Sequence, residues 1–254
     1  AGISTTLSNV IASILMFRYI IKGNSIIKFS FNNSFKFNKH IIYDLIKIGV
    51  PASLEQVVLR TGILLFTKIV ANLGTVVLAA HQITISILGI SFQPGHAFGI
   101  AAASLVGRSL GSNNPEEAEE YAKETHRIGF VISTFMALLF FIFGPQLVGL
   151  YSDDPIIIKN SSDALKIIAI TQTFQSSQFI IVGALRGAGD TLWPLVSSSI
   201  GVILIRVTLA YIFVKKMGYG LTGAWMADFV DQLFRWIFIH IRFKTGRWKY
   251  VSIR

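Results

Sequence analysis

Residues 128–150 read IGFVISTFMALLFFIFGPQLVGL and contain no charged side chain. A hydrocarbon core about 30 Å thick is crossed by about 20 apolar residues in an α-helix. Six further stretches of about this size predict membrane spans, at 1–21, 48–71, 76–106, 160–185, 192–214 and 221–241. The predicted fold class is therefore all-α, a polytopic membrane bundle of about seven transmembrane helices.

The composition agrees with a membrane protein. Hydrophobic residues make up 52% of the chain and charged residues 14%, against about 25% charged in an average soluble domain. The net charge of +10 does not predict a nucleic-acid partner, because the basic residues lie in short runs between long apolar stretches, as in cytoplasmic loops. The absence of cysteine excludes disulfides and cysteine-based metal or redox chemistry.

The lysines and arginines predict the orientation. Most of those outside the spans lie at 22–47, 107–127 and 185–191 and after residue 241, whereas the opposite side has Lys159, Lys215 and Lys216. The positive-inside rule then predicts a multi-pass plasma-membrane protein with a cytoplasmic carboxy terminus. Because the chain begins at Ala1, inside an apolar stretch and without a signal peptide, we expect it to be a fragment or a processed chain.

Two connections carry further signals. In 107–127, the run Asn114-Pro115-Glu116-Glu117 predicts a helix start, with Asn as the cap, and we expect that helix to lie outside the hydrocarbon. The segment 23–40 is rich in Phe, Asn, Ser and Lys. It predicts a short extended or amphipathic link at the membrane surface.

Charged residues inside spans are expensive and are therefore functional candidates. Glu55 follows Pro51 by about one turn, and the proline loosens the helix and frees backbone groups there. A carboxylate in this setting can bind H⁺ or Na⁺, so Glu55 is the candidate for cation coupling, and the adjacent Gln56 is a candidate for lining a cavity. The alternative is a structural pair of Glu55 with Arg60 or with another helix, or a position near the interface.

The fifth span is unusually polar, because seven of the eight residues at 171–178 are Thr, Gln or Ser. Such a face would be costly against lipid. Gln172, Gln175 and Gln178 are therefore predicted to line a water-filled cavity. The alternative is hydrogen bonding between helices, which needs the same residues.

The sixth and seventh spans also contain charges. Asp231 and Arg235 are four residues apart and can pair along one helix face, with Asp228 on the same face. A network that includes Arg206 is predicted, since an unpaired charge at this depth would be unstable. Arg206, Asp228 and Asp231 are candidates for lining the cavity; structural pairing near the cytoplasmic end is the alternative.

The third span is long and is predicted to be broken at Pro94. Gly95, Gly99, Ala103 and Gly107 then follow at intervals of four. Small residues at this spacing form a helix face that a second helix can approach closely, so this face predicts tight packing.

No nucleophile motif, phosphate-binding loop or metalloprotease motif is present in the sequence. An enzyme is therefore not expected, and no catalytic or metal-binding residue is assigned. No cofactor is predicted beyond H⁺ or Na⁺ as a coupling ion.

An ordered set of motifs resembles a known family. The motifs are Gly49-Val50-Pro51-Ala52-Ser53-Leu54-Glu55, Leu78-Ala79-Ala80-His81-Gln82-Ile83, Leu105-Val106-Gly107-Arg108-Ser109-Leu110-Gly111, Leu185-Arg186-Gly187-Ala188-Gly189-Asp190-Thr191 with Pro194, and Arg242-Phe243-Lys244-Thr245-Gly246-Arg247-Trp248. Together they resemble the carboxy-terminal lobe of the multidrug and toxic compound extrusion (MATE) transporters, in the bacterial DinF-like branch.

The resemblance implies twelve helices in two six-helix lobes around a central cavity, and exchange of H⁺ or Na⁺ for organic cations or other amphipathic compounds. It assigns 1–22 to the last helix of the amino-terminal lobe, 23–47 to a cytoplasmic linker, 48–241 to the carboxy-terminal lobe and 242–254 to a basic tail. The expected partners are the lipid bilayer, the substrate and the missing amino-terminal lobe. In the turn at 185–191, Gly187 and Gly189 allow a tight bend and Asp190 is expected to cap the next helix.

The sequence departs from the family at two places. Several members have an acid about two turns past the proline, where this chain has Leu59, and some have an acid in the helix equivalent to the fifth span, where this chain has amides and hydroxyls. The family's cation site is therefore not carried over, and Glu55 stays a candidate.

Two other functions compete with the antiporter. A flippase for lipids or lipid-linked oligosaccharides, of a related fold, is disfavoured because acids and amides are as prominent in the spans as basic residues. A half-length protein that does not itself transport is the third hypothesis, and an upstream reading frame that encodes six more helices would exclude it.

Overall fold

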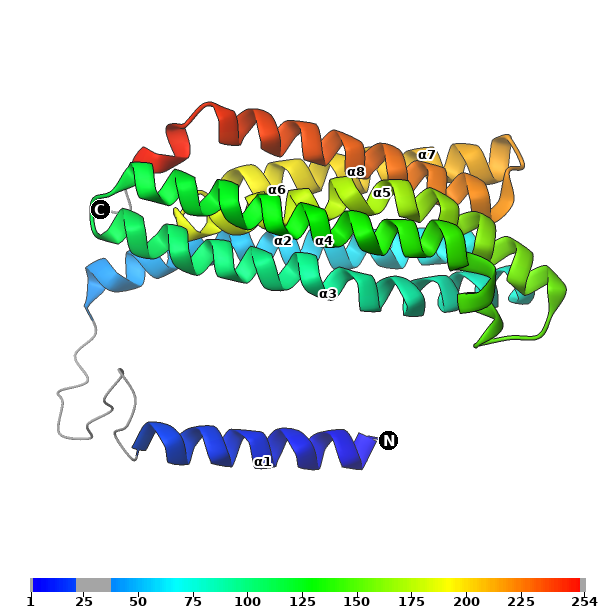
Figure 1. Ribbon diagram of the computed structural model, residues 1–254, viewed down its shortest axis with the longest axis horizontal. Helices are drawn as coiled ribbons and strands as arrows, with labels where there is room; N and C mark the ends of the chain where they lie inside the picture. The colour runs from blue at the N-terminus through cyan, green and yellow to red at the C-terminus, as the bar shows by residue number, and fades with distance from the viewer. Residues whose placement is uncertain (1, 22–37, 252–254) are drawn as a thin grey trace. The chain divides into compact units, whose positions relative to one another are not determined.

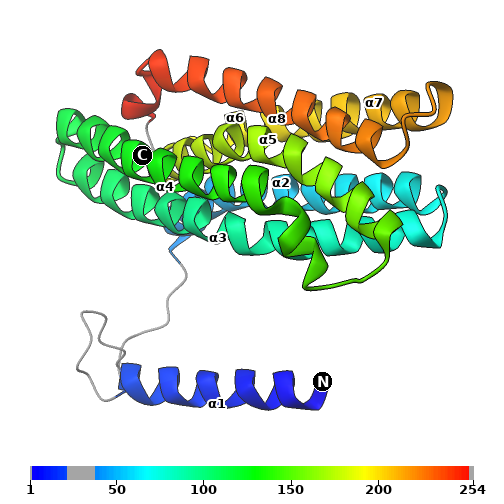
Figure 2. The same cartoon turned by 45° about the vertical axis from the view of Figure 1, so that its right-hand side comes forward.

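The computed structural model describes residues 2–21 and 38–251, and this part of the chain is helical with short connections (Figures 1 and 2). The long helices are α1 (Gly2–Ile21), α2 (Lys39–Ala71), α3 (Thr75–Gly111), α4 (Pro115–Gly149), α5 (Pro155–Gly187) and α8 (Gly220–Lys244). A composite helix from Leu192 to Lys216 joins α6 (Leu192–Ser198), η1 (Ser199–Val207), α7 (Thr208–Tyr211) and η2 (Ile212–Lys216), and a 3₁₀ turn, η3 (Arg247–Tyr250), follows α8.

The predicted all-α fold class is confirmed for the described residues, and each of the seven predicted spans coincides with a helix. Within residues 2–21 and 38–251, four helices can cross a membrane by length and composition: α3, α4, α5 and the composite helix. Residues up to Ile42 and residues from Tyr43 onward form separate units. We call the second unit, from Tyr43 to Val251, the lobe.

The connections are shorter than predicted. Asn114 caps α4 as expected, because its side chain accepts a hydrogen bond from the N–H of Glu117 at 3.2 Å. The predicted helix start is thus confirmed, and α4 continues without a break from Pro115 into the apolar stretch; that its first turns lie outside the hydrocarbon stays a prediction. Likewise α2 begins at Lys39, inside the predicted linker at 23–47; the Phe-rich segment of that linker at 22–37 lies outside the described residues.

The predicted break at Pro94 is also wrong, because α3 remains helical through it. A proline removes one backbone hydrogen bond, and packed neighbouring helices compensate for that loss in membrane bundles. Within the predicted basic tail at 242–254, α8 extends to Lys244 and the 3₁₀ turn η3 follows. Trp248 is fully buried and stacks on Phe243, and its Nε1 donates to the Phe243 carbonyl at 2.9 Å.

The helix at the centre of the lobe is α5. It packs against α3, α4 and α8, and most of its membrane-length segment is buried. Two apolar clusters lie at opposite ends of this bundle. One gathers around Phe66, Leu165 and Trp225, and the other around Val106, Leu185 and Ile239. The polar run at 171–178 lies between them, so the lobe has a polar layer in its middle.

The predicted small-residue face on α3 is confirmed, and it packs on α5. A Cβ on Gly99 would lie 2.9 Å from the carbonyl oxygen of Phe179, and a Cβ on Gly107 3.1 Å from that of Gly187. A Cβ on Gly183 would overlap the backbone of Gly99. The two backbones are therefore in contact, and no side chain fits between them.

Helix α2 contacts the rest of the lobe at few points. Gly62 lies against Val202 of η1. Phe66 meets Trp225 of α8 edge-on, with ring centroids 5.9 Å apart. Phe66 also lies near His81 of α3, with ring centroids 5.7 Å apart. Between these contacts a cavity remains, lined by α2, α3 and α5.

We predict that Gly183→Val lowers the thermal stability of the protein. The added side chain would push α3 and α5 apart, and overpacking of this kind costs about 1–3 kcal/mol. The melting temperature of the purified protein, measured by size-exclusion chromatography after heating, would report the loss. Gly89→Val on α3 is the matched control, because nothing lies within 4 Å of a Cβ at that position. Equal melting of the two variants would contradict the close contact.

Candidate functional site

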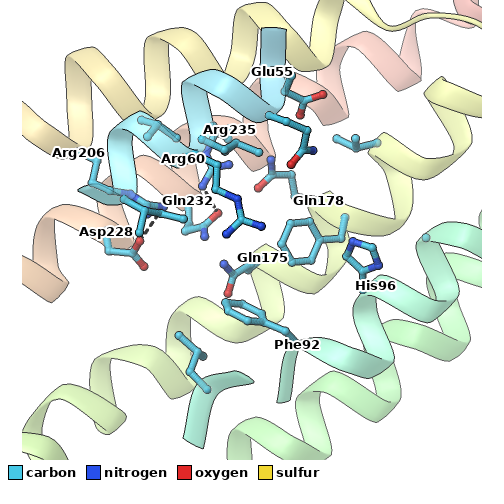
Figure 3. Close-up of a pocket in the computed structure, with 18 of the residues that line it drawn as sticks. Glu55, Arg60, Phe92, His96, Gln175, Gln178, Arg206, Asp228, Gln232 and Arg235 are labelled. Atoms are coloured by element: carbon cyan, nitrogen blue, oxygen red, sulfur yellow. Dashed lines mark hydrogen bonds and ion pairs between the residues drawn. The ribbon is translucent and has the colours of Figure 1, made fainter. Parts of the chain in front are cut away.

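The cavity has a volume of about 530 Å³, within the range of about 300–1,000 Å³ that is usual for small-molecule sites. It is lined by α2, α3, α5, η1 and α8 (Figure 3). The polar lining consists of Glu55, Gln56, Arg60, Thr67, His81, His96, Gln175, Gln178, Arg186, Arg206, Asp228, Gln232 and Arg235.

One face of α2 forms a wall of the cavity. Gln56, Arg60, Ile63 and Thr67 line it, and their spacing of three or four residues places them on one side of the helix. The structure thus places Gln56 where the sequence predicted it, on the cavity.

The polar run of α5 divides between the two roles that the sequence left open. Gln175 and Gln178 line the cavity. Gln172 does not; it is buried, and its Nε2 donates to the carbonyl of Ser91 on α3 at 3.1 Å. For Gln172 the cavity prediction is therefore wrong and the alternative, a hydrogen bond between helices, is right.

The two serines of this run also join helices. Ser176 is hydrogen-bonded to Ser133 of α4. The Ser177 hydroxyl accepts from Trp236 Nε1 of α8 at 2.8 Å and lies 2.6 Å from His126 Nε2 of α4. The polar layer of the lobe is thus partly structural, and only its α2-facing side belongs to the cavity.

Glu55 pairs with another helix rather than with Arg60. Its side chain is 4% exposed, and one carboxylate oxygen lies 2.7 Å from the Arg186 guanidinium at the end of α5. The Ser198 hydroxyl donates to the other oxygen at 3.2 Å. Glu55 therefore joins three helices, α2, α5 and α6, next to the cavity.

The predicted network around Arg206 is formed by the composite helix and α8. An Arg206 NH2 group lies 2.7 Å from Asp228 and 2.6 Å from Asp231. Arg235 donates to Asp231 from Nε at 2.9 Å and from NH2 at 3.0 Å. Gly201 makes room for this network, since a Cβ there would overlap Asp231 and Arg235.

Asp231 does not line the cavity, so that prediction is wrong for this residue. It is fully buried behind Arg206 and Arg235, where its carboxylate accepts hydrogen bonds from both guanidinium groups. Arg206 and Asp228 do line the cavity. Arg206 lies in η1, a π-helical segment, and such segments are rare and common at functional sites.

The sequence reading missed three residues of the site. It treated the turn after α5 as structural, whereas Arg186 is the partner of Glu55. It considered Arg60 only as a possible partner of Glu55 and assigned no role to Gln232, whereas both line the cavity. Their signal was present, because each is polar and lies within or at the end of an apolar span.

Asp190 was expected to cap α6. Its carboxylate instead accepts from Arg242 Nε at 2.8 Å, and Thr191 precedes α6 without a side-chain cap. Gly189 has a φ of 80°, as expected of a tight turn, but Gly187 serves the contact with α3.

A bundle of membrane-length helices around a cavity lined by paired charges and amides defines a polytopic membrane protein of the transporter class. The MatE family model matches residues 51–212. The chain therefore belongs to the MatE family of multi-pass membrane transporters.

Several relatives carry related names. The chain is 31% identical over 206 residues to a probable multidrug resistance protein NorM of Thermotoga maritima, covering 81% of this chain and 44% of that protein. It is 28% identical to the uncharacterized transporter YisQ of Bacillus subtilis, over 97% of this chain and 54% of that protein. The chain thus spans about half the length of these relatives.

Solved structures share the fold. An outward-facing multidrug resistance MATE family transporter of the MOP superfamily superimposes with a TM-score of 0.85 at 21% identity. The match covers 97% of this chain and 56% of that one. The predicted family and the half-protein coverage are both confirmed.

We predict that Arg206→Gln strongly destabilises the lobe. It leaves Asp228 without its partner, and breaking a buried ion pair costs about 3–5 kcal/mol. Adding Asp228→Asn should recover part of the loss, since Asp231 keeps Arg235. Melting temperatures of the two variants and the parent would measure both effects. If Arg206→Gln melts like the parent, the network does not stabilise the lobe.

Proposed function

We propose that the chain is the carboxy-terminal lobe, with the preceding helix, of a secondary efflux transporter that exchanges H⁺ or Na⁺ for amphipathic compounds by alternating access. Membership of the MatE family supports transport, and the relatives named multidrug resistance proteins support efflux. The domain layout at 1–22, 23–47, 48–241 and 242–254 is part of this proposal, with an amino-terminal lobe as the partner across the cavity.

The observation that carries the proposal is the Glu55–Arg186 pair beside the cavity. A carboxylate held by a partly exposed guanidinium, whose side chain is 35% exposed, can exchange that partner for H⁺ or Na⁺. Because the pair links α2 to α5 and α6, a cation on Glu55 would loosen α2 from the rest of the lobe. We therefore keep Glu55 as the coupling residue.

The limited packing of α2 supports a movement of this helix. Transporters change access by rocking packed units against each other around a central site. In this lobe α3, α4, α5 and α8 are closely packed, and α2 contacts them at few points. Access would change where α2 borders the cavity.

The orientation proposed is multi-pass in the plasma membrane with a cytoplasmic carboxy terminus. The α3–α4 turn, the α5–α6 turn and the end of α8 lie at one end of the lobe (Figure 1). Arg108, Arg186 and Arg242 are near that end, and Lys215 and Lys216 are at the other. The positive-inside rule places the first end in the cytoplasm.

A flippase for lipids or lipid-linked oligosaccharides is the second candidate. The observation in its favour is that four arginines but only two carboxylates line the cavity. Three of these arginines are paired with acids, so this observation alone does not displace the antiporter.

We predict that Glu55→Gln strongly weakens coupling without loss of folded protein. Glutamine keeps the shape of the side chain and can accept from Ser198, but it does not exchange H⁺ or Na⁺. Ethidium efflux from vesicles containing the complete transporter, with H⁺ and Na⁺ gradients imposed separately, should fall about tenfold, a factor equal to about 1.4 kcal/mol. The gradient that drives efflux in the parent identifies the coupling ion.

Two variants serve as controls. Glu55→Asp keeps a carboxylate and should retain part of the gradient-driven efflux. Asp163→Asn removes an exposed carboxylate that pairs with Lys166 at 3.1 Å, away from the cavity, and should leave efflux unchanged. Parental efflux in Glu55→Gln would refute the assignment. Absence of efflux from the folded parent under either gradient would favour the flippase.

A further inference from the structure

Arg60 differs from the other arginines of the cavity, because no described residue is bound to it. Arg186 pairs with Glu55, Arg206 with Asp228 and Asp231, and Arg235 with Asp231. Neither a hydrogen bond nor an ion pair engages Arg60 within residues 2–21 and 38–251. Figure 3 shows its side chain reaching into the pocket from α2.

The charge balance of the cavity follows from these pairs. Four guanidinium groups line it, and they face three carboxylates, Glu55 and Asp228 in the lining and Asp231 behind it. One positive charge is therefore in excess, and Arg60 carries it. An organic cation would be repelled at this position, whereas an anion would be attracted.

Gln232 adds a hydrogen-bond donor to the same cavity. Its side-chain oxygen accepts from Arg235 NH2 at 2.8 Å. An arginine has no acceptor, so the amide atom that faces Arg235 must be the oxygen. The NH₂ group of Gln232 is then left to donate, and an anionic group is a strong acceptor for it.

The rest of the lining is apolar. Phe92 and Phe179 pack edge-to-face with their centroids 5.8 Å apart, and both border the cavity together with Ile63, Leu88 and Ile100. A ligand that fits this lining has a charged or polar head and an apolar or aromatic body.

We propose that this lobe binds an amphipathic organic anion, with a carboxylate, sulfonate or phosphate head on Arg60 and Gln232 and an apolar body on Phe92 and Phe179. A guanidinium group offers such heads two parallel N–H donors. The inference deepens the proposed function and rests on it only in taking this cavity as the substrate site.

The test uses two probes that share one aromatic body and differ in charge, 1-pyrenebutyrate and 1-pyrenebutylammonium. The complete transporter is placed in nanodiscs of phosphatidylcholine, and binding is followed by energy transfer from tryptophan to pyrene, since Trp225 borders the cavity. Nanodiscs without protein correct for partition into lipid. The parent should bind the carboxylate more tightly than the ammonium probe.

The Arg60→Gln variant should weaken binding of the carboxylate about tenfold, as expected for the loss of a hydrogen bond to a charged group, and should not weaken binding of the ammonium probe. Arg60→Lys keeps the charge and should retain part of the preference. Arg127→Gln is the matched control, because it removes an exposed guanidinium outside the cavity. An unchanged carboxylate affinity in Arg60→Gln, or a parent that prefers the ammonium probe, would overturn the proposal.

The experiment separates the anion site from the proposed function. Absence of gradient-driven efflux of both ethidium and pyrenebutyrate, with intact pyrenebutyrate binding, would refute the antiporter and leave the anion site standing. The source of the anion is resolved in vesicles, where pyrenebutyrate efflux indicates a free organic anion, and Arg60-dependent translocation of fluorescent phosphatidylglycerol indicates a lipid headgroup. Either result requires the site on Arg60.

Discussion

The cost of an unpaired charge away from water organises this lobe. Isolated charges in a membrane interior cost at least several kcal/mol, and the structure responds by placing each buried carboxylate against a guanidinium group. Asp231 is fully buried and pairs with both Arg206 and Arg235, and Glu55 pairs with Arg186 at the end of α5. These pairs connect α2, α5, the composite helix and α8, so the pairing of charges also fixes how the helices surround the cavity. Arg60 departs from this rule among the described residues, and the anionic ligand proposed above would supply its missing partner.

The pairs depend in turn on a scaffold that does not deform easily. Helices α3 and α5 touch through glycines, with Gly183 against Gly99, and hydroxyl and amide groups in the middle layer join α5 to α3, α4 and α8. In lipid, close backbone contact and hydrogen bonds between helices replace much of the hydrophobic driving force. The packed helices form one wall of the cavity, and α2, which is joined to them mainly through Glu55, Gly62 and Phe66, forms the other.

Sequence reasoning reached the helices, the small-residue face and the Arg206 network because each leaves a local signal: apolar length, a spacing of four, or charges inside a span. It failed where the outcome depended on a partner distant in sequence. Whether Gln172 faces a cavity or a neighbouring carbonyl depends on the position of Ser91, 81 residues away. Glu55 pairs with Arg186 rather than with Arg60, which is near it in sequence, because the packing of α2 near the end of α5 brings the two side chains together. Asp231 likewise lies behind Arg206 and Arg235 because of the rotation of α8 about its axis. The pattern of charges in the sequence does not specify that rotation.

In the proposed efflux transporter, the charge of the substrate would also decide what drives export. Moving one elementary charge across a membrane is worth about 2.3 kcal/mol per 100 mV, and a cell interior is negative. Exchange of one inward H⁺ for one outward monovalent cation moves no net charge, so only the proton concentration gradient drives it. Exchange of one inward H⁺ for one outward anion moves two charges in the favourable direction. A cavity whose unpaired guanidinium selects anions would therefore couple export to the membrane potential. The proton concentration gradient used through Glu55 would then need to supply less of the driving force than in an exporter of cations.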